Sequence, residues 1–174
     1  LPLLLCACVS QSNKPSGKLP TRIAFGSCAD QNQPMPVLDQ VVALNPDLFI
    51  YLGDNIYGDT DDMDTLQAKY QTLAAREEFQ RLKQSTPLLA TWDDHDYGGG
   101  QLFADREAEG KEHSRRAMLE SFANPPRLTQ PEDQGTYFQF TRGDSEFFVV
   151  DARWHRPRLC SAEGGGVACQ PEDD

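Results

Sequence analysis

Three clusters of polar residues in this sequence consist of side chains that bind metals or move protons. Each cluster directly follows a short apolar run. A thiol, carboxylates, an amide and an imidazole can together hold cations, activate a water molecule and protonate a leaving group. The clusters are Gly26-Ser27-Cys28-Ala29-Asp30 after residues 22–25, Gly53-Asp54-Asn55 after residues 48–52, and Asp93-Asp94-His95-Asp96 after residues 88–92.

The apolar runs before these clusters predict β-strands. Residues 48–52 are too short for a helix and rich in Phe, Ile and Tyr, which is typical of a strand buried on both faces. Residues 35–44 have a helical apolar pattern that Pro46 closes, so we expect a parallel strand–helix–strand unit. In a parallel sheet the three strand ends would lie side by side, at the edge where open α/β sheets bind ligands.

Periodicity and chain breakers predict the other elements. The acidic residues 60–64 lack the glycine and glutamate of an EF-hand loop, so we interpret them as a loop and helix N-cap. A helix starts near Thr65 and breaks near Arg76, and a second short helix follows. Residues 111–122 predict another helix, and residues 137–141 and 146–150 predict a β-hairpin around the turn Arg142-Gly143-Asp144-Ser145.

Four segments, in their order and spacing, resemble the PhoD-like alkaline phosphatases, a branch of the metallophosphatases. The resemblance covers about residues 21–159. It implies an α/β fold of the metallophosphoesterase-like (calcineurin-like) type, an αββα sandwich of which this chain would hold the N-terminal half only. The segments are Phe25-Gly26-Ser27-Cys28, Gly53-Asp54-Asn55-Ile56-Tyr57, Thr91-Trp92-Asp93-Asp94-His95-Asp96 and Val149-Val150-Asp151-Ala152-Arg153.

The resemblance implies hydrolysis of phosphate esters with two or more metal ions, Fe(III) and Ca(II). Asp54 is expected to bridge two metals, because the two oxygens of a carboxylate can bind separate ions. We expect Cys28 to bind as a thiolate and Tyr57 as a phenolate, the latter on a strong Lewis acid such as ferric iron. Asp94 offers a hard carboxylate that suits calcium. Composition alone does not choose this metal pair over zinc or manganese.

Three further residues are expected to act on the substrate. In the resemblance His95 lies near the leaving group, where it could donate a proton or a hydrogen bond. Asp96 could orient the His95 imidazole. Arg153 could bind the substrate phosphate, and an ion pair between Arg153 and Asp151 is the equally favoured alternative.

Length and charge restrict the class of protein. The 174 residues suffice for one domain with a sizeable core. A net charge of −11 argues against a nucleic-acid-binding surface. It is compatible with phosphate-ester substrates, because bound cations would dominate the local field.

The first 20 residues predict export. Residues 1–8 resemble the end of a secretory signal, and Leu5-Cys6-Ala7-Cys8 resembles a bacterial lipobox in which lipidation of Cys8 would anchor the protein to a membrane. The alternative is a cleaved signal without lipid. Residues 9–20 are rich in Ser, Asn, Pro, Gly and Lys and predict a flexible tether. The protein would then be periplasmic or a membrane-anchored lipoprotein of a bacterium.

Cys160 and Cys169 bracket a run of glycines near the end of the sequence. In the oxidising compartment that export implies, a disulfide between them is expected, and two free thiols are the alternative.

The sequence therefore predicts an exported, metal-dependent phosphomonoesterase or phosphodiesterase. A non-catalytic exported lipoprotein with the same fold is the alternative from another class. We further expect residues 21–174 to be the N-terminal part of the catalytic domain, because the histidines that would complete a two-metal site are absent from this sequence. On that interpretation the chain alone would aggregate and be inactive.

Overall fold

The computed structural model describes residues 20–98, 108–122, 124 and 135–156, together with the backbone of two short strands at 159–160 and 167–168. Cys8, Cys169 and the side chain of Cys160 lie outside the described residues, so the expected lipidation and disulfide stay predictions. Among the described residues, no helix is both long and apolar enough to cross a membrane.

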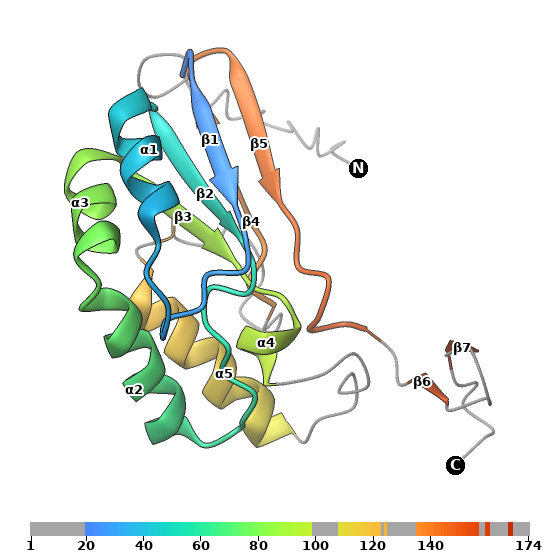
Figure 1. Ribbon diagram of the computed structural model, residues 1–174. Helices are drawn as coiled ribbons and strands as arrows, with labels where there is room; N and C mark the ends of the chain where they lie inside the picture. Colours follow the sequence, from blue (N-terminus) through green and yellow to red (C-terminus); the bar gives the residue numbers. More distant parts are fainter. Residues whose placement is uncertain are drawn as a thin grey trace, which may run out of the picture.

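A three-stranded parallel sheet lies at the centre of the fold (Figure 1). Its strands are β1 (Ile23–Gly26), β2 (Leu48–Leu52) and β3 (Leu88–Thr91), paired in this order. All three expected strands and the strand–helix–strand connection are confirmed. Because the strands are parallel, their carboxyl ends meet at one edge of the sheet.

Helices cover one face of this sheet (Figure 1). The break expected near Arg76 separates α2 from α3, and Asp62 caps α2 by accepting a hydrogen bond from the Thr65 N–H at 2.8 Å. The short helix α4 was not expected, and it begins directly after Asp93. The helices are α1 (Pro36–Leu44), α2 (Met63–Ala74), α3 (Glu77–Ser85), α4 (Asp94–Tyr97) and α5 (Ala108–Ser121).

The main core lies between the helices and the sheet. Alternate residues of β2, Phe49 and Tyr51, point toward the helices, and both are buried. They pack in one cluster with residues of all the longer helices, among them Leu38, Leu66, Leu82 and Met118. This packing anchors the strand ends that carry the polar clusters.

A β-hairpin contributes to a second, smaller core on the other side of the sheet. Its strands are β4 (Phe138–Arg142) and β5 (Ser145–Val149), which pair antiparallel as expected. Phe138 is buried with Leu48 and Leu89, and Phe140 and Val149 pack on that cluster. Both faces of β2 are thus covered, in agreement with its continuous apolar sequence. Two further short strands, β6 (Leu159–Cys160) and β7 (Val167–Ala168), pair antiparallel.

The side chain of Asn124 forms hydrogen bonds with the backbone at the β3 edge of the sheet. Asn124 accepts a hydrogen bond from the Ala90 N–H at 2.9 Å and donates one to the Ala90 carbonyl at 2.7 Å. The amide thereby mimics a neighbouring strand and uses the backbone groups that an edge strand would otherwise leave unpaired.

Candidate active site

The loops after β1 and β2 are tied together at the carboxyl edge of the sheet. The Cys28 N–H donates to the Gly53 carbonyl at 3.3 Å, and the Ala29 N–H donates to the Asp54 carbonyl at 2.8 Å. Both Cys28 and Asp54 have left-handed backbone conformations, with φ of 60° and 50°. Non-glycine residues seldom adopt this conformation, and it is often found at functional sites. The loops are therefore shaped to bring Cys28 to Asp54.

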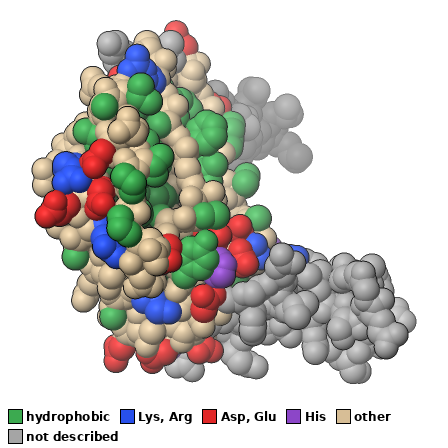
Figure 2. All heavy atoms as spheres, viewed as in Figure 1, with side chains coloured by type: hydrophobic (Ala, Val, Ile, Leu, Met, Phe, Trp, Pro, Cys, Tyr) green, Lys and Arg blue, Asp and Glu red, His purple; other side chains and the backbone are tan. Residues whose placement is uncertain are grey.

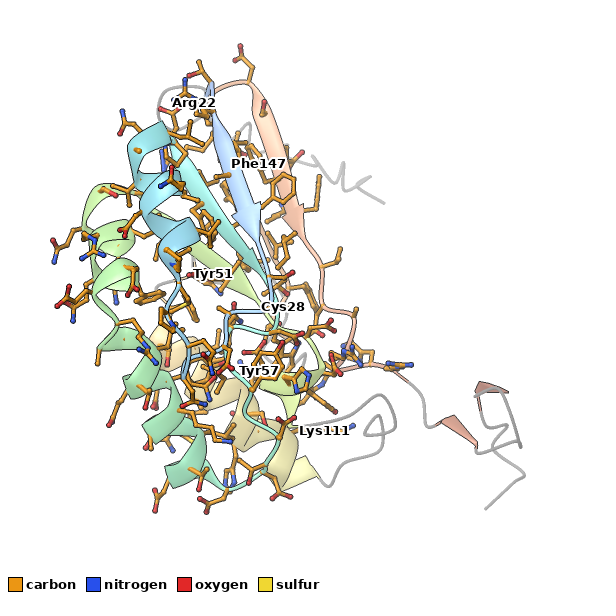
Figure 3. All side chains as sticks on the ribbon, viewed as in Figure 1. Arg22, Cys28, Tyr51, Tyr57, Lys111 and Phe147 are labelled. Atoms are coloured by element: carbon orange, nitrogen blue, oxygen red, sulfur yellow. The ribbon has the colours of Figure 1, made fainter. Side chains whose placement is uncertain are left out.

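Cys28, Asp54 and Tyr57 form the first half of the site. The Cys28 thiol lies 3.5 Å from Asp54 Oδ2. Figure 3 shows Cys28 and Tyr57 below the strand ends. Burial and the nearby Cys28 and Asp54 side chains raise the pKa of the Tyr57 phenol. The three side chains expected to share one metal thus lie together.

Three carboxylates form the second half. Asp54, Asp93 and Asp94 each offer an oxygen, and these oxygens all lie within 4.8 Å of one another. Burial and the neighbouring Asp94 raise the pKa of the Asp54 carboxyl. Oxygen atoms of this kind and spacing could bind a metal cation, and a cation there would lower the cost of bringing the negative charges together.

Asp54 belongs to both halves. Its Oδ2 faces Cys28, whereas its Oδ1 lies 3.4 Å from the His95 N–H. Asp54 is only 8% exposed, with the Cys28 thiol against its Oδ2 and the Asp93 and Asp94 carboxylates within 4.8 Å. A carboxylate in this position could bridge two metal ions.

Arg153 comes to the site from the hairpin side and pairs with the acidic cluster. Its Nε donates to Asp93 Oδ1 at 2.6 Å, and its Nη2 donates to Asp94 Oδ1 at 3.2 Å. The alternative of an ion pair with Asp151 is wrong, because the Asp151 carboxylate accepts backbone N–H groups, from Arg153 at 2.8 Å and Trp154 at 2.9 Å. Asp151 thus shapes the turn that delivers the guanidinium.

His95 pairs with a carboxylate that the sequence did not single out. Its Nδ1 lies 2.7 Å from Oδ1 of Asp59, and its ring packs against the Tyr57 ring with centroids 4.2 Å apart. Burial lowers the pKa of the imidazole, but the hydrogen bond and charge of Asp59, with Asp54 and Asp94, raise it overall. Acidic and histidine side chains meet on the surface beneath the strands in Figure 2.

Asp96 does not orient His95 in the way expected. The Asp96 carboxylate is fully buried and accepts five hydrogen bonds from the loops and from α2. It turns inward because consecutive residues of the α4 turn point about 100° apart. Asp96 therefore joins the loops after β2 and β3 to α2. Its donors are the N–H groups of Asn55, Ile56 and Asp93, the Asn55 amide and the Tyr70 hydroxyl, at 3.0–3.2 Å.

Two neighbours of the site, Asp59 and Asp93, had no expected role, although Asp93 belongs to the third polar cluster. Asp59 ends the run Gly53-Asp54-Asn55-Ile56-Tyr57-Gly58-Asp59, so a second acidic residue close to the expected ligands was the available signal. Asp93 stands directly before Asp94. Its participation depends on the α4 turn, which points both carboxylates toward Arg153.

The parallel sheet carries acidic, thiol, phenol and imidazole side chains at its carboxyl edge, and such groups could hold metal ions and transfer protons. A model of the PhoD-like phosphatase family matches residues 23–162, and the chain belongs to this family. No curated protein matches the sequence.

A solved structure of PhoD has a similar fold. The TM-score is 0.65 at 19% sequence identity, and the match covers 85% of this chain and 34% of the PhoD chain. At this identity the likeness concerns the fold. The chain thus spans about a third of the length of that relative.

Proposed function

We propose that this chain carries part of the active site of a metal-dependent phosphatase that hydrolyses small phosphate esters, monoesters or diesters. The observation that carries the proposal is the position of the Asp54 carboxylate, which lies 3.5 Å from the Cys28 thiol and has an oxygen within 4.8 Å of oxygens of Asp93 and Asp94. Acidic side chains placed this close repel one another, so a structural role alone gives no reason for their grouping, whereas a bound cation does.

The donor chemistry fits two kinds of cation. Cys28 and Tyr57 would hold a strong Lewis acid such as Fe(III), and Asp94 would hold Ca(II), with Asp54 shared. Such cations would polarise the phosphoryl group and provide an activated water.

The other residues act on the substrate. The P–O bond to the leaving group breaks as a water oxygen bonds to phosphorus. His95 donates a proton from Nε2 to the departing oxygen and regains one from solvent, so that ester and water yield alcohol and phosphate. Arg153 supplies a fork of N–H donors for the phosphoryl oxygens. Asp93 and Asp94 hold that fork at the edge of the site.

We also propose that residues 21–174 are the N-terminal part of a longer αββα domain. Two observations support this: helices and hairpin lie on opposite faces of the sheet, and the chain covers 34% of PhoD. The N-terminal segment, with Cys8 in its lipobox-like tetrad, supports an exported and lipid-anchored protein. Metabolic labelling with a fatty acid, lost in Cys8→Ala, would test the anchor.

Turnover of 4-nitrophenyl phosphate and bis(4-nitrophenyl) phosphate by the full-length protein tests the proposed function. We expect chelator-sensitive hydrolysis that Asp54→Asn lowers by at least about 100-fold together with metal content. Asp64→Asn, an exposed substitution in the first turn of α2, is the matched control. Full rate and full metal content in Asp54→Asn would contradict the proposal. Phosphate-ester binding without turnover would favour the non-catalytic alternative.

A further inference from the structure

His95 and Asp59 are held together by both side chains and backbone, although 36 positions separate them in the sequence. His95 Nδ1 lies 2.7 Å from Asp59 Oδ1. In addition, the N–H groups of Gly58 and Asp59 both donate to the His95 carbonyl, at 3.1 and 3.2 Å. The contact therefore has a fixed geometry and does not depend on two free surface side chains meeting.

The loop that carries Asp59 is built closely against His95. A Cβ added at Gly58 would lie 2.7 Å from the His95 carbonyl oxygen and 2.9 Å from Leu66 Cδ2. Lys69 Nζ donates to the carbonyls of Tyr57 at 3.0 Å and Gly58 at 2.6 Å. Asp59 itself has a left-handed backbone, with φ of 51°. Each of these features keeps the Asp59 carboxylate against the imidazole.

Stability alone does not account for this pair. The side chains of His95 and Asp59 are 30% and 47% exposed. Pairs with this exposure contribute little to folding, because water and salt screen them. A carboxylate that accepts a hydrogen bond from Nδ1 instead fixes the tautomer and the orientation of the ring, and leaves Nε2 for another partner.

We propose that Asp59 is the positioning residue of His95, which it holds with Nδ1–H toward the carboxylate and Nε2 presented to the leaving group. The inference rests on the proposed function, since it assigns Asp59 to the proton transfer made by His95. It replaces the expectation that Asp96 has this task. The Tyr57 ring packed on the imidazole, at 4.2 Å between centroids, restricts the ring from a second side.

The test compares a good and a poor leaving group in the full-length protein loaded with metal. A residue that positions a proton donor matters most when the leaving oxygen needs the proton. In Asp59→Asn we expect kcat to fall about 10- to 100-fold for phenyl phosphate and under about 3-fold for 4-nitrophenyl phosphate, with KM and metal content unchanged. Asp64→Asn removes the same charge nearby and should leave both rates intact.

Two further measurements separate the possible outcomes. In His95→Asn the added Asp59→Asn should have no further effect, because the two residues act as one unit. Nitrogen-15 NMR of the metal-free protein should report a proton on His95 Nδ1 that Asp59→Asn alters.

Equal losses for both substrates together with lost metal would overturn the inference, and so would unchanged rates. An inactive wild type would contradict the proposed function and remove this inference with it. An active wild type with an insensitive Asp59→Asn would contradict the inference only.

Discussion

At the scale of single residues, the site brings negatively charged side chains close together. Asp54, Asp93 and Asp94 lie in one cluster, and among the described residues Arg153 forms ion pairs with Asp93 and Asp94. Like charges at this spacing repel one another, so a cation between them is favourable. The residue-level predictions concern the groups that supply or accept this positive charge.

Tyr57→Phe removes one oxygen and keeps the ring that packs on His95. If Tyr57 binds ferric iron as a phenolate, the iron-loaded full-length protein has a visible charge-transfer band that this variant loses. Absorption spectra of iron-loaded wild type and variant are the measurement. Tyr137→Phe, on the hairpin side, is the control and should keep the band. A colourless active enzyme, or a variant that keeps its colour, would show that Tyr57 is not a ligand.

Arg153→Met should destabilise the metal-free protein by about 1–3 kcal/mol, because it leaves two partly buried carboxylates without their charged donor. Added metal should restore much of this stability, since a cation takes over the neutralisation. Urea unfolding with chelator and with metal measures both effects.

The matched control for Arg153→Met is Arg116→Met, which breaks the exposed pair with Glu120, with side chains 64% and 47% exposed. This change should leave the free energy of unfolding nearly unchanged. If both variants lose the same small amount of stability, Arg153 is not the counter-ion of the cluster.

At the scale of elements, Asp96 connects β2, β3, α2 and α4 through one buried carboxylate. Burial raises its pKa to about 7, although hydrogen bonds from Asn55, Asp93 and Tyr70 oppose this shift. Burial and the Asp96 carboxylate raise the pKa of the Tyr70 hydroxyl, which donates a hydrogen bond to Asp96 at 3.0 Å. The loops that carry Asp54 and Asp94 therefore depend on a group that titrates near neutral pH.

The free energy of unfolding of the metal-free protein should fall as pH rises from about 4 to 7. Unfolded Asp96 releases its proton near pH 4, whereas folded Asp96 keeps it up to about pH 7. The folded state thus binds more protons in this window, and raising the pH favours unfolding, by on the order of 2–4 kcal/mol in total. The pKa of His95 is also raised in the folded state, so His95 likewise contributes stability that is lost as the pH rises.

Urea unfolding in chelator at pH 4.5, 5.5, 6.5 and 7.5 measures this slope. Asp96→Asn should be less stable overall, because an amide nitrogen faces N–H donors, but its stability should change less with pH. Stability that rises through this window in the wild type would contradict the assignment of a raised pKa to Asp96.

At the scale of the whole molecule, the hairpin packs one face against the sheet, and alternate residues of β5 on its other face are exposed. Phe138 of the hairpin is buried against the sheet. The exposed apolar residues of the hairpin region are Phe148 and Val150, at 65% and 71%. Large exposed side chains of this kind mark surfaces that associate.

Residues 19–174 expressed alone should therefore self-associate and show no metal-dependent turnover. The double substitution Phe148→Thr with Val150→Thr should reduce the association measured by light scattering and leave the unfolding midpoint nearly unchanged. Phe147→Thr, the adjacent inward residue that stacks on Phe140 at 4.7 Å, should instead lower the midpoint. A monodisperse protein with robust chelator-sensitive turnover would contradict this prediction.

Patterns within short segments predicted most of the elements. The continuous apolar run of β2 predicts a strand covered on both faces, and the break near Arg76 separates two helices. These features depend on neighbours within a few positions, so a single sequence contains them. The helix α4 escaped prediction because four residues are too few to display a period.

The sequence by itself determined which chemical groups stand at the strand ends, because parallel strands bring their carboxyl ends to one edge. Only the tertiary structure decided how these groups pair. Within α4, adjacent side chains point about 100° apart, so Asp94 faces Arg153, His95 faces Asp59 and Asp96 turns into the core. Asp96 was the expected partner of His95 because the two residues are adjacent in the sequence. Packing of the two loops instead brought in Asp59, from 36 residues away.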